Sequence, residues 1–498
     1  MKCQRVMIVL LCCAAMCCVV GGTNVSPAIQ SRPAAESHLE YGIHTLRADG
    51  ELLQMVHDAG ARWVVELFSW REIAQWRGEY DWEYPDAVVR GAEFYGLKVA
   101  ARLDQQPAWA RRAPAENGPP DDLNDYADFV EAVAARYRGR VAAYIIWNEP
   151  NLAFEWGGAP PNPAAYVDML RVAYQRAKRA DPDCLVVSAG LAPTNHHDPT
   201  AMDDRLYLEG MYQAGAAAYF DVLGAHPYGF AYDPYAPYEV GDGLNFSRLS
   251  ALRDIMVRYG DAYKPVWATE VGWTVGTVWH AVSLTHQADY LVGAFQRAQQ
   301  EWPWLTMMAA WTLSRSLPTE DEKQGYNMLD ELGRPRPVYF AFRELARRAP
   351  RSLDARPRQQ AGPVEILASD VTLHLGDSEL PPPWRPLRKG ANPADTWEAD
   401  FYILDPGTED WTLYAELMQP NERTSTVYIN GQRLTPNLPV EDYSRTWTAH
   451  TWHVPINLLR PGLNRLQLQV GMDLPDYQQT GYVWDDVQIR HVFLAHLP

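Results

Sequence analysis

Two stretches of the sequence decide the fold: AAYIIWNEPN at residues 142–151 and PVWATEVGWT at residues 265–274. Each is an apolar run that ends in a carboxylate, Glu149 in the first and Glu270 in the second. Near-continuous apolar runs are typical of strands that are buried on both faces of a parallel sheet. A carboxylate directly after such a run is costly unless it has partners or a function. The two stretches therefore predict parallel strands whose ends carry a pair of acidic groups.

Six further apolar, β-branched segments predict strands, which makes eight in all: Tyr41–Thr45, Trp63–Trp70, Lys98–Asp104, Cys184–Pro193, Phe220–Gly229 and Leu305–Ser314. Helices are predicted at Glu51–Ala59, Tyr84–Tyr95, Leu123–Tyr137, Ala164–Ala180, Ser247–Tyr259, Leu284–Glu301 and Pro337–Arg348. Eight alternations of strand and helix over about 300 residues predict a (β/α)8 TIM barrel at residues 41–348. An open doubly wound sheet is the alternative, but no glycine-rich phosphate loop follows an early strand.

The C-terminal part of the chain changes character. Residues 349–364 are rich in Pro and Arg and are predicted to be a linker. Residues 365–498 read as an all-β, jelly-roll-like sandwich of short alternating strands. Val427–Gln432 contains an Asn-Gly pair, which predicts a hairpin, and Leu466–Val470 alternates between apolar and polar residues. The chain is therefore an α/β barrel followed by a β-sandwich.

Charge and the N-terminus limit the partners and the location. The formal net charge of −18 repels phosphate backbones and anionic lipid, so we expect no nucleic-acid partner. Lys2 and Arg5, then the apolar run Val6–Val20 and two glycines, have the layout of a secretory leader over residues 1–22, followed by an N-terminal tail at residues 23–40. We expect a secreted or extracytoplasmic protein without stable membrane insertion once the leader is removed; an uncleaved leader acting as an anchor is the alternative. Oligomeric state is not predicted.

The two carboxylates suit one chemistry in particular. In a β/α barrel the working residues lie at the C-terminal ends of the strands, so Glu149 and Glu270 are expected to converge across the barrel mouth. Glycoside hydrolysis needs one protonated carboxyl group and one ionised carboxylate. They lie ~5–5.5 Å apart in retaining enzymes and ~6.5–9.5 Å apart in inverting ones. The pair therefore predicts a glycosidase, with the separation left open.

These residues resemble a known group of enzymes. Asn148-Glu149-Pro150 at the end of the fourth strand, with Glu270 ending the seventh, is similar to the clan A glycoside hydrolases, among them thirty-nine-like and family five cellulase-like enzymes. The resemblance covers most of residues 41–345. Further similar stretches are Gly78–Glu83 with Gly96–Val99, Pro107–Ala110, His226–Tyr228 and Trp311.

The resemblance implies roles for individual residues. Glu149 would be the acid/base and Glu270 the nucleophile, and Asn148 would hydrogen-bond the 2-hydroxyl group of the sugar. Tyr228 would keep Glu270 ionised and oriented, and His226 lies two residues away on the same strand face. Trp311 would stack beneath the sugar ring.

One departure from the clan pattern concerns an arginine. Many members carry an Arg near the end of strand one or two that supports the nucleophile, but the second strand, Trp63–Leu67, holds none. Arg102 on the third strand could supply that charge; alternatively it pairs with Asp104 or Glu66. Glu66 interrupts an apolar strand and is otherwise unexplained; a partner that supports the active-site residues is the functional alternative.

Several other residues are weighed against plain structural roles. Tryptophans that could form sugar subsites or simply fill the core are Trp70, Trp109, Trp147, Trp156, Trp273 and Trp279. In the sandwich, a sugar platform or a structural core could use Trp384, Trp397, Trp411, Trp447, Trp452 and Trp484. His196–Asp198 lacks a second cluster with ligand spacing, so we expect no metal. Cys184 is expected to be an inert core thiol.

The sequence thus predicts a retaining glycoside hydrolase that cleaves β-glycosidic bonds of a polysaccharide or oligosaccharide without a cofactor. A transglycosylase would use the same pair of carboxylates and differ in excluding water. A non-catalytic carbohydrate-binding or cell-surface protein on the same scaffold is the alternative from another class. An envelope protein would in addition retain its leader as an anchor.

Overall fold

The computed structural model describes residues 39–113, 117–317, 322–349, 362–375, 396–418, 425–437, 447–470 and 487–496. The predicted leader and nearly all of the N-terminal tail lie outside these residues, as does most of the predicted linker. Within them, no helix combines the length and the apolar character that crossing a membrane requires.

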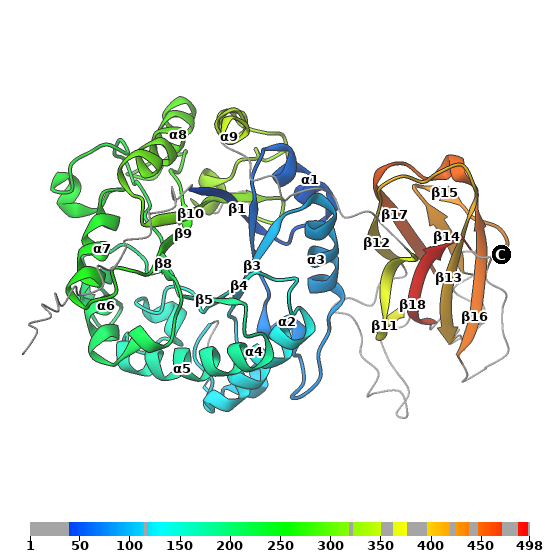
Figure 1. Ribbon diagram of the computed structural model, residues 1–498, viewed down its shortest axis with the longest axis horizontal. Coiled ribbons are helices and arrows are strands. Elements are labelled where there is room, and N and C mark those ends of the chain that lie inside the picture. Colours follow the sequence, from blue (N-terminus) through cyan, green and yellow to red (C-terminus); the bar gives the residue numbers. More distant parts are fainter. Residues whose placement is uncertain are drawn as a thin grey trace, which may run out of the picture. The chain divides into compact units, whose positions relative to one another are not determined.

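Eight parallel strands form the predicted barrel (Figure 1). They are β1 (Glu40–Leu46), β2 (Trp63–Leu67), β3 (Lys98–Leu103), β4 (Ala143–Ile146), β5 (Leu185–Ser188), β8 (Leu223–Ala225), β9 (Val266–Val271) and β10 (Leu305–Ser314). Neighbours pair in the order β5-β4-β3-β2-β1-β10-β9-β8. A parallel bridge between Val187 and Val222 joins the two ends of this order, and the Ser188 amide donates to the Val222 carbonyl at 3.1 Å. The sheet is therefore a closed barrel and not the open doubly wound alternative.

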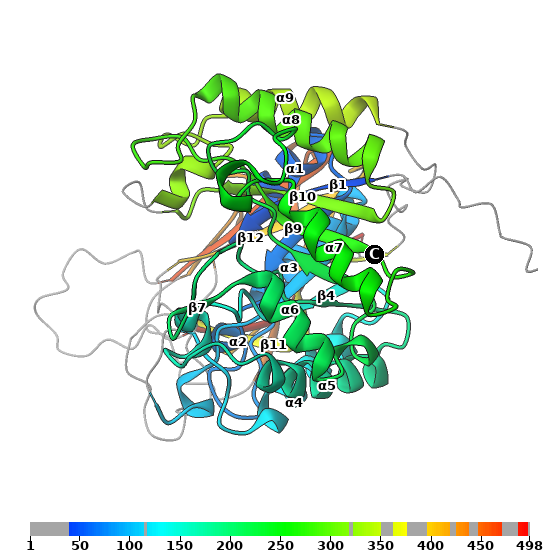
Figure 2. The same cartoon turned by 90° about the vertical axis from the view of Figure 1, so that its left-hand side faces the viewer.

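Helices surround the strands (Figures 1 and 2). They are α1 (Gly50–Asp58), α2 (Trp70–Ile73), α3 (Glu83–Tyr95), α4 (Leu123–Arg136), α5 (Pro163–Ala180), α6 (Asp204–Gln213), α7 (Arg248–Arg258), α8 (Leu284–Glu301) and α9 (Pro337–Arg348). The Asp49 side chain accepts from the Leu52 amide at 2.8 Å and caps α1, and Gly96, with φ 66°, ends α3 in the left-handed conformation. Both helix ends follow from ordinary capping chemistry.

The structure contains two helices, α2 and α6, that the sequence analysis did not predict. The predicted second strand ran to Trp70, but β2 ends at Leu67 and Trp70 begins α2. α6 was not predicted, although Asp203 caps it by accepting from the Arg205 amide at 2.9 Å. The predicted strands generally ran too far at their C-terminal ends, because apolar residues continue into the buried loops of the barrel rim.

Side chains fill the barrel lumen below that rim. The indole rings of Trp63 and Trp267 meet edge to face with their centroids 4.7 Å apart. Small and branched residues, with one methionine, complete this inner layer: Val65, Ala100, Ala143, Ile145, Val187, Val222, Met307 and Ala309. The lumen is therefore a packed core, and polar chemistry is confined to the C-terminal rim.

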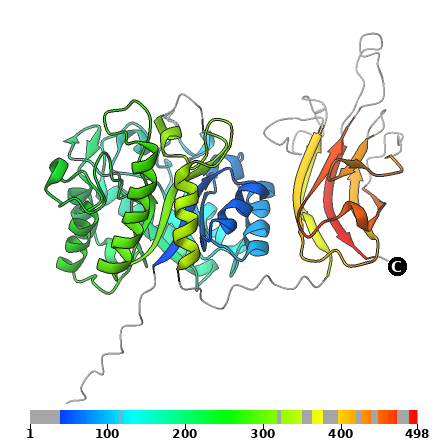
Figure 3. The ribbon, with the colours of Figure 1, turned by 90° about the horizontal axis from the view of Figure 1, so that it is seen from above.

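The C-terminal region is the predicted antiparallel sandwich (Figure 3). One sheet contains β11 (Val364–Leu375), β18 (Val487–Ala495), β13 (Trp411–Met418) and β16 (Thr448–Val454); the other contains β12 (Thr396–Ile403), β17 (Gly462–Gln469), β14 (Thr426–Ile429) and β15 (Gln432–Arg433). The predicted hairpin joins β14 to β15 through Asn430 and Gly431, with φ 50° and 78°. Trp397, Trp411 and Trp452 are buried, which favours a core role for these three over a sugar platform. Trp447 is half-buried, whereas Trp384 and Trp484 lie outside the described residues.

Candidate active site

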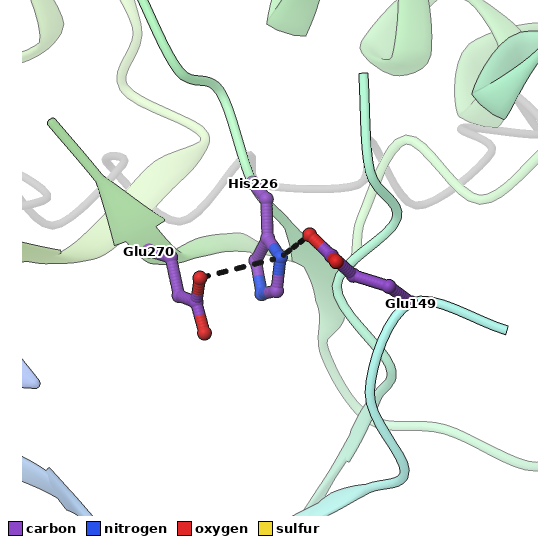
Figure 4. Close-up of side chains that lie close together, drawn as sticks. All are labelled: Glu149, His226 and Glu270. Atoms are coloured by element: carbon purple, nitrogen blue, oxygen red, sulfur yellow. Dashed lines mark hydrogen bonds and ion pairs between the residues drawn. The ribbon is translucent and has the colours of Figure 1, made fainter. Parts of the chain in front are cut away.

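Glu149 and Glu270 converge at the C-terminal rim of the barrel. One oxygen of each carboxylate and one ring nitrogen of His226 all lie within 4.8 Å of one another. Figure 4 shows the imidazole of His226 between the two carboxylates. Strands β4, β8 and β9, which are far apart in sequence, thus bring three titratable groups into one cluster.

The chain leaves β4 in an unusual backbone conformation that presents Glu149. Trp147 and Glu149 have positive φ values of 73° and 38°. Non-glycine residues rarely adopt this conformation, and where they do, it often marks a functional site. The Glu149 amide donates to the Gly190 carbonyl at 3.1 Å, and the buried Trp147 indole donates to the Glu155 carbonyl at 2.8 Å. These anchors hold the loop on both sides of Glu149.

Glu270 belongs to β9 itself and has strong donors on both oxygens. Arg102 Nη1 donates to Oε1 at 2.9 Å, and the Tyr228 hydroxyl donates to Oε2 at 2.6 Å. The side chain is only 7% exposed. Burial alone would raise the pKa of Glu270, but the charges of His226 and Arg102 and the hydrogen bond from the Tyr228 hydroxyl outweigh it and lower the pKa. Glu270 is therefore held as a carboxylate.

Arg102 lies beside Glu270, the position that the sequence analysis suggested for a supporting cation. Its Nη1 also donates to Asn148 Oδ1 at 3.2 Å, and its Nε lies 3.0 Å from Asp104 Oδ2. Burial would lower the pKa of Arg102, but Asp104 and Glu270 raise it above its ordinary value. The guanidinium therefore stays charged between two carboxylates, and of its suggested ion-pair partners it contacts Asp104.

His226 links the two carboxylates. Its Nδ1 lies 2.8 Å from Glu149 Oε1 and 3.7 Å from Glu270 Oε2. Burial acts to lower its pKa, but the charges of Glu270 and Glu149 outweigh burial and raise it. On the other side, the ring packs on Gly190, where a Cβ atom would meet Nε2 at 2.2 Å. Only a glycine at that position leaves room for this imidazole.

Glu155 is a part of the site that the sequence analysis missed. Asn148 Nδ2 donates to its Oε1 at 3.0 Å, and Asn117 Nδ2 donates to its Oε2 at 2.6 Å. Burial, with Asp104 and Glu149 nearby, raises the pKa of Glu155 to about 7. Since Asn148 gives one N–H to Glu155 and its oxygen accepts from Arg102, its second N–H is the donor left for a ligand.

His44 was also missed, although it lies near the C-terminal end of β1 on the same rim. Its Nδ1 donates to the Thr45 carbonyl at 3.0 Å, which leaves Nε2 as an acceptor 3.4 Å from Arg102 Nη1. Burial lowers the pKa of His44 to about 3, helped by Arg102 and His226 and opposed by Glu270. His44 is therefore a neutral support for Arg102. A polar residue near the C-terminal end of an apolar strand, a signal similar to the one that marked Glu149, could have identified it.

Aromatic rings form one side of the site. Trp311 is half-buried, and its ring centroid lies 6.2 Å from that of Tyr228 and 5.5 Å from that of Tyr326, a residue the sequence analysis did not single out. Its buried indole N–H has no hydrogen-bond partner among the described residues. The structure thus places Trp311 beside Tyr228, which donates to Glu270.

Other residues named from the sequence lie outside this cluster. Glu66 accepts from Thr45 Oγ1 at 2.7 Å and from the Ala48 amide at 3.1 Å, so it fixes the turn after β1. Trp109 is half-buried and donates to the Ala74 carbonyl at 2.8 Å, and His196 is exposed. Four tryptophans are buried and present no open ring face to a sugar: Trp70, Trp147, Trp156 and Trp273. Trp279 is exposed.

The same cluster is the grouping of described residues that could hold a metal ion, with one ligand atom each from Glu149, His226 and Glu270. Both Glu270 oxygens already accept hydrogen bonds, and the Arg102 cation lies 2.9 Å from one of them. A metal ion would compete with that positive charge. The donor set therefore suits proton transfer better than metal binding, and the expectation of no cofactor stays a prediction.

No protein-family model matches the sequence, and no curated protein sequence is significantly similar to it. Solved structures with a similar fold include a family 39 glycoside hydrolase from Bacteroides cellulosilyticus, which is 17% identical over 87% of this chain and 81% of that chain, with a TM-score of 0.49. A glucosidase from Croceicoccus marinus is 13% identical over 93% and 97%, with a TM-score of 0.49. Xylanase 10B from Thermotoga petrophila, in complex with xylobiose, is 15% identical over 63% and 95%, with a TM-score of 0.44. At these TM-scores the similarities carry no weight for the chemistry, which rests on the side chains described above.

Proposed function

We propose that this protein is a retaining glycoside hydrolase that cleaves β-glycosidic bonds of an oligosaccharide or polysaccharide. The observation that carries the proposal is a pair of carboxylates in unequal surroundings, with one oxygen of each within 4.8 Å of the other. So close an approach fits the ~5–5.5 Å spacing of retaining enzymes better than the ~6.5–9.5 Å that an inverting enzyme needs for its water. The β configuration follows from the resemblance to clan A.

The unequal surroundings of Glu270 and Glu149 suit the two carboxylates to different roles in the reaction. Glu270 receives hydrogen bonds from a guanidinium and a hydroxyl, so negative charge is most stable there. Glu149 has His226 as its hydrogen-bond partner and is 16% exposed, so it can exchange a proton with a leaving group and with water. We therefore assign Glu270 as the nucleophile and Glu149 as the acid/base.

In the first step, a carboxylate oxygen of Glu270 attacks the anomeric carbon while Glu149 gives its proton to the departing glycosidic oxygen. The C–O bond to the leaving group breaks, and a glycosyl ester forms on Glu270. In the second step, Glu149 takes a proton from a water molecule, whose oxygen attacks the anomeric carbon and releases Glu270. Two inversions at the anomeric carbon give net retention.

The free N–H of Asn148 and the ring of Trp311 fit the positioning of the sugar. Asn148 would donate to a sugar hydroxyl, and such a bond accelerates the reaction where it strengthens in the transition state. Trp311 offers a flat apolar face to the C–H side of a sugar ring. Both roles are part of the proposal, as is export, which fits the leader-like residues 1–22 and a glycan met outside the cytoplasm.

The test is hydrolysis of aryl glycosides and polysaccharides of both anomeric configurations by the wild type, Glu149→Gln and Glu270→Gln. Exposed Glu301 on α8 supplies a matched control, Glu301→Gln. We expect β-glycoside cleavage that collapses in both site variants and persists in the control. Cleavage of α-glycosides alone would overturn the β assignment, and tight sugar binding without any cleavage would favour the non-catalytic alternative.

A further inference from the structure

Trp279 is the most exposed tryptophan of the barrel region among the described residues, with 73% of its surface open to solvent. It lies in the loop at residues 272–283, between β9 and α8. This loop follows the strand that carries Glu270, so it belongs to the C-terminal rim where the candidate site lies. A large apolar ring exposed beside a polar site is a candidate for ligand contact.

A series of ring contacts connects Trp279 to the candidate site. The Trp279 ring stacks on Phe230 with centroids 6.4 Å apart and an angle of 20° between the planes. Phe230 comes two residues after Tyr228, whose hydroxyl donates to Glu270. The neighbouring His280 lies 3.4 Å from the Tyr326 hydroxyl through its Nε2, and Tyr326 in turn packs on Trp311. The rings therefore run from the carboxylate pair outward to Trp279.

Phe230 and His280 support one side of the Trp279 ring. Phe230 has a positive φ of 52°, and its ring also contacts His280 with centroids 5.7 Å apart. His280 Nε2 in turn lies 3.0 Å from Glu322 Oε1. Because one face of the indole rests on Phe230 and most of the residue is exposed, the opposite face is open to solvent.

We propose that Trp279 is a sugar-binding subsite for a unit of the glycan chain beyond the one whose bond is cleaved. The inference rests on the proposed glycosidase function and sharpens its substrate to a β-linked chain of at least two sugars. An open, pre-positioned indole face suits the apolar C–H face of a sugar ring and adds no charge that would select against a neutral glycan.

The test compares substrates of different length on the wild type and on Trp279→Ala. The shortest is the β-glycosyl fluoride of the sugar that the wild type cleaves, because its leaving group is one atom and reaches no neighbouring subsite. The others are β-linked oligosaccharides of that sugar with two to six units. Tyr263→Ala is the matched control, since Tyr263 is 78% exposed but precedes β9, at the other end of the barrel.

We expect Trp279→Ala to lose about tenfold in kcat/KM on the longer oligosaccharides, the effect of an aromatic contact of ordinary strength. Its kcat/KM on the fluoride should stay unchanged, which also shows that the variant is folded, and Trp279→Phe should recover part of the loss. An equal loss on fluoride and oligosaccharides, or no loss on either, would overturn the subsite while leaving the glycosidase proposal intact. A wild type that cleaves no glycoside would overturn both.

Discussion

Glu149 and Glu270 both follow apolar strands of the same barrel, yet their surroundings differ in every respect that matters for proton chemistry. Glu270 lies within β9, is 7% exposed, and accepts hydrogen bonds from Arg102 and Tyr228. Glu149 lies beyond the end of β4 on a backbone with positive φ, is 16% exposed, and has His226 as its hydrogen-bond partner.

The comparison shows that hydrogen-bond donors and nearby charges, more than burial, determine which of two neighbouring carboxylates stays ionised. Burial acts to raise the pKa of Glu270, but the groups that face it reverse the effect. A carboxylate that stays ionised suits nucleophilic attack, whereas a carboxyl group on a reachable loop beside a histidine suits proton exchange with a leaving group and with water.

The largest expected effect comes from replacing Glu270 with alanine. Loss of a covalent nucleophile should lower kcat on the order of 10⁵- to 10⁶-fold. Added azide should restore turnover of an activated β-glycoside by attacking from the side that Glu270 vacates, and should give the α-glycosyl azide. NMR of the product checks this prediction. A β-glycosyl azide from Glu270→Ala would reverse the assigned roles, because that product is expected from Glu149→Ala.

Glu149→Gln should have a smaller effect that depends on the leaving group. We expect a loss of roughly 10²- to 10⁴-fold, the usual contribution of general acid catalysis, on substrates whose leaving group needs a proton. On a glycosyl fluoride or dinitrophenyl glycoside, the first step should be nearly unaffected, because the leaving group departs without protonation. Pre-steady-state kinetics separate the two steps. An equal loss of the first step on all leaving groups would contradict the acid role.

Arg102→Met and Tyr228→Phe test the donors that distinguish Glu270. Each removes a hydrogen bond to a charged group, worth about 1.5–3 kcal/mol, so kcat/KM should fall roughly 10- to 100-fold. Because these donors lower the pKa of Glu270, their loss should raise it, and the acidic limb of the pH profile should move to higher pH. Arg140→Met, which breaks a half-exposed pair with Glu93, should leave the limb in place. An unmoved limb in both site variants would contradict the account.

Of these variants, Glu155→Gln should have the smallest effect on kcat/KM, and the effect should appear only above about pH 7. The pKa of Glu155 is raised to about 7, so the group is protonated below that pH and ionised above it. Glutamine resembles the protonated form, so kcat/KM should match the wild type below pH 7 and fall a few-fold above it, where Asn148 loses a charged acceptor. A pH-independent loss would indicate a purely structural role for Glu155.

Much of this architecture could be predicted from the sequence, because each barrel strand is an apolar run and most intervening helices are amphipathic. Glu149 and Glu270 were visible because a carboxylate after an apolar run requires a reason. Glu155 was hidden: its contact with Asn148 depends on a loop that passes through positive φ at Trp147 and Glu149, and non-glycine residues there give no local signal. His44 is part of strand β1, so its place near the strand end could be read from the sequence, but its position beside Arg102 emerges only when the barrel closes.

The central claim is that Glu270 forms a covalent bond to the sugar. The most direct measurement treats the enzyme with the dinitrophenyl 2-deoxy-2-fluoro-β-glycoside of the sugar it cleaves, which should form the ester readily and hydrolyse it slowly. Peptide mass spectrometry then locates the adduct. The account predicts one fluoroglycosyl group per chain, on the peptide that contains Glu270, and none on Glu270→Gln. A label on another residue, or an unlabelled enzyme that releases product with inverted anomeric configuration from the unmodified glycoside, would contradict it.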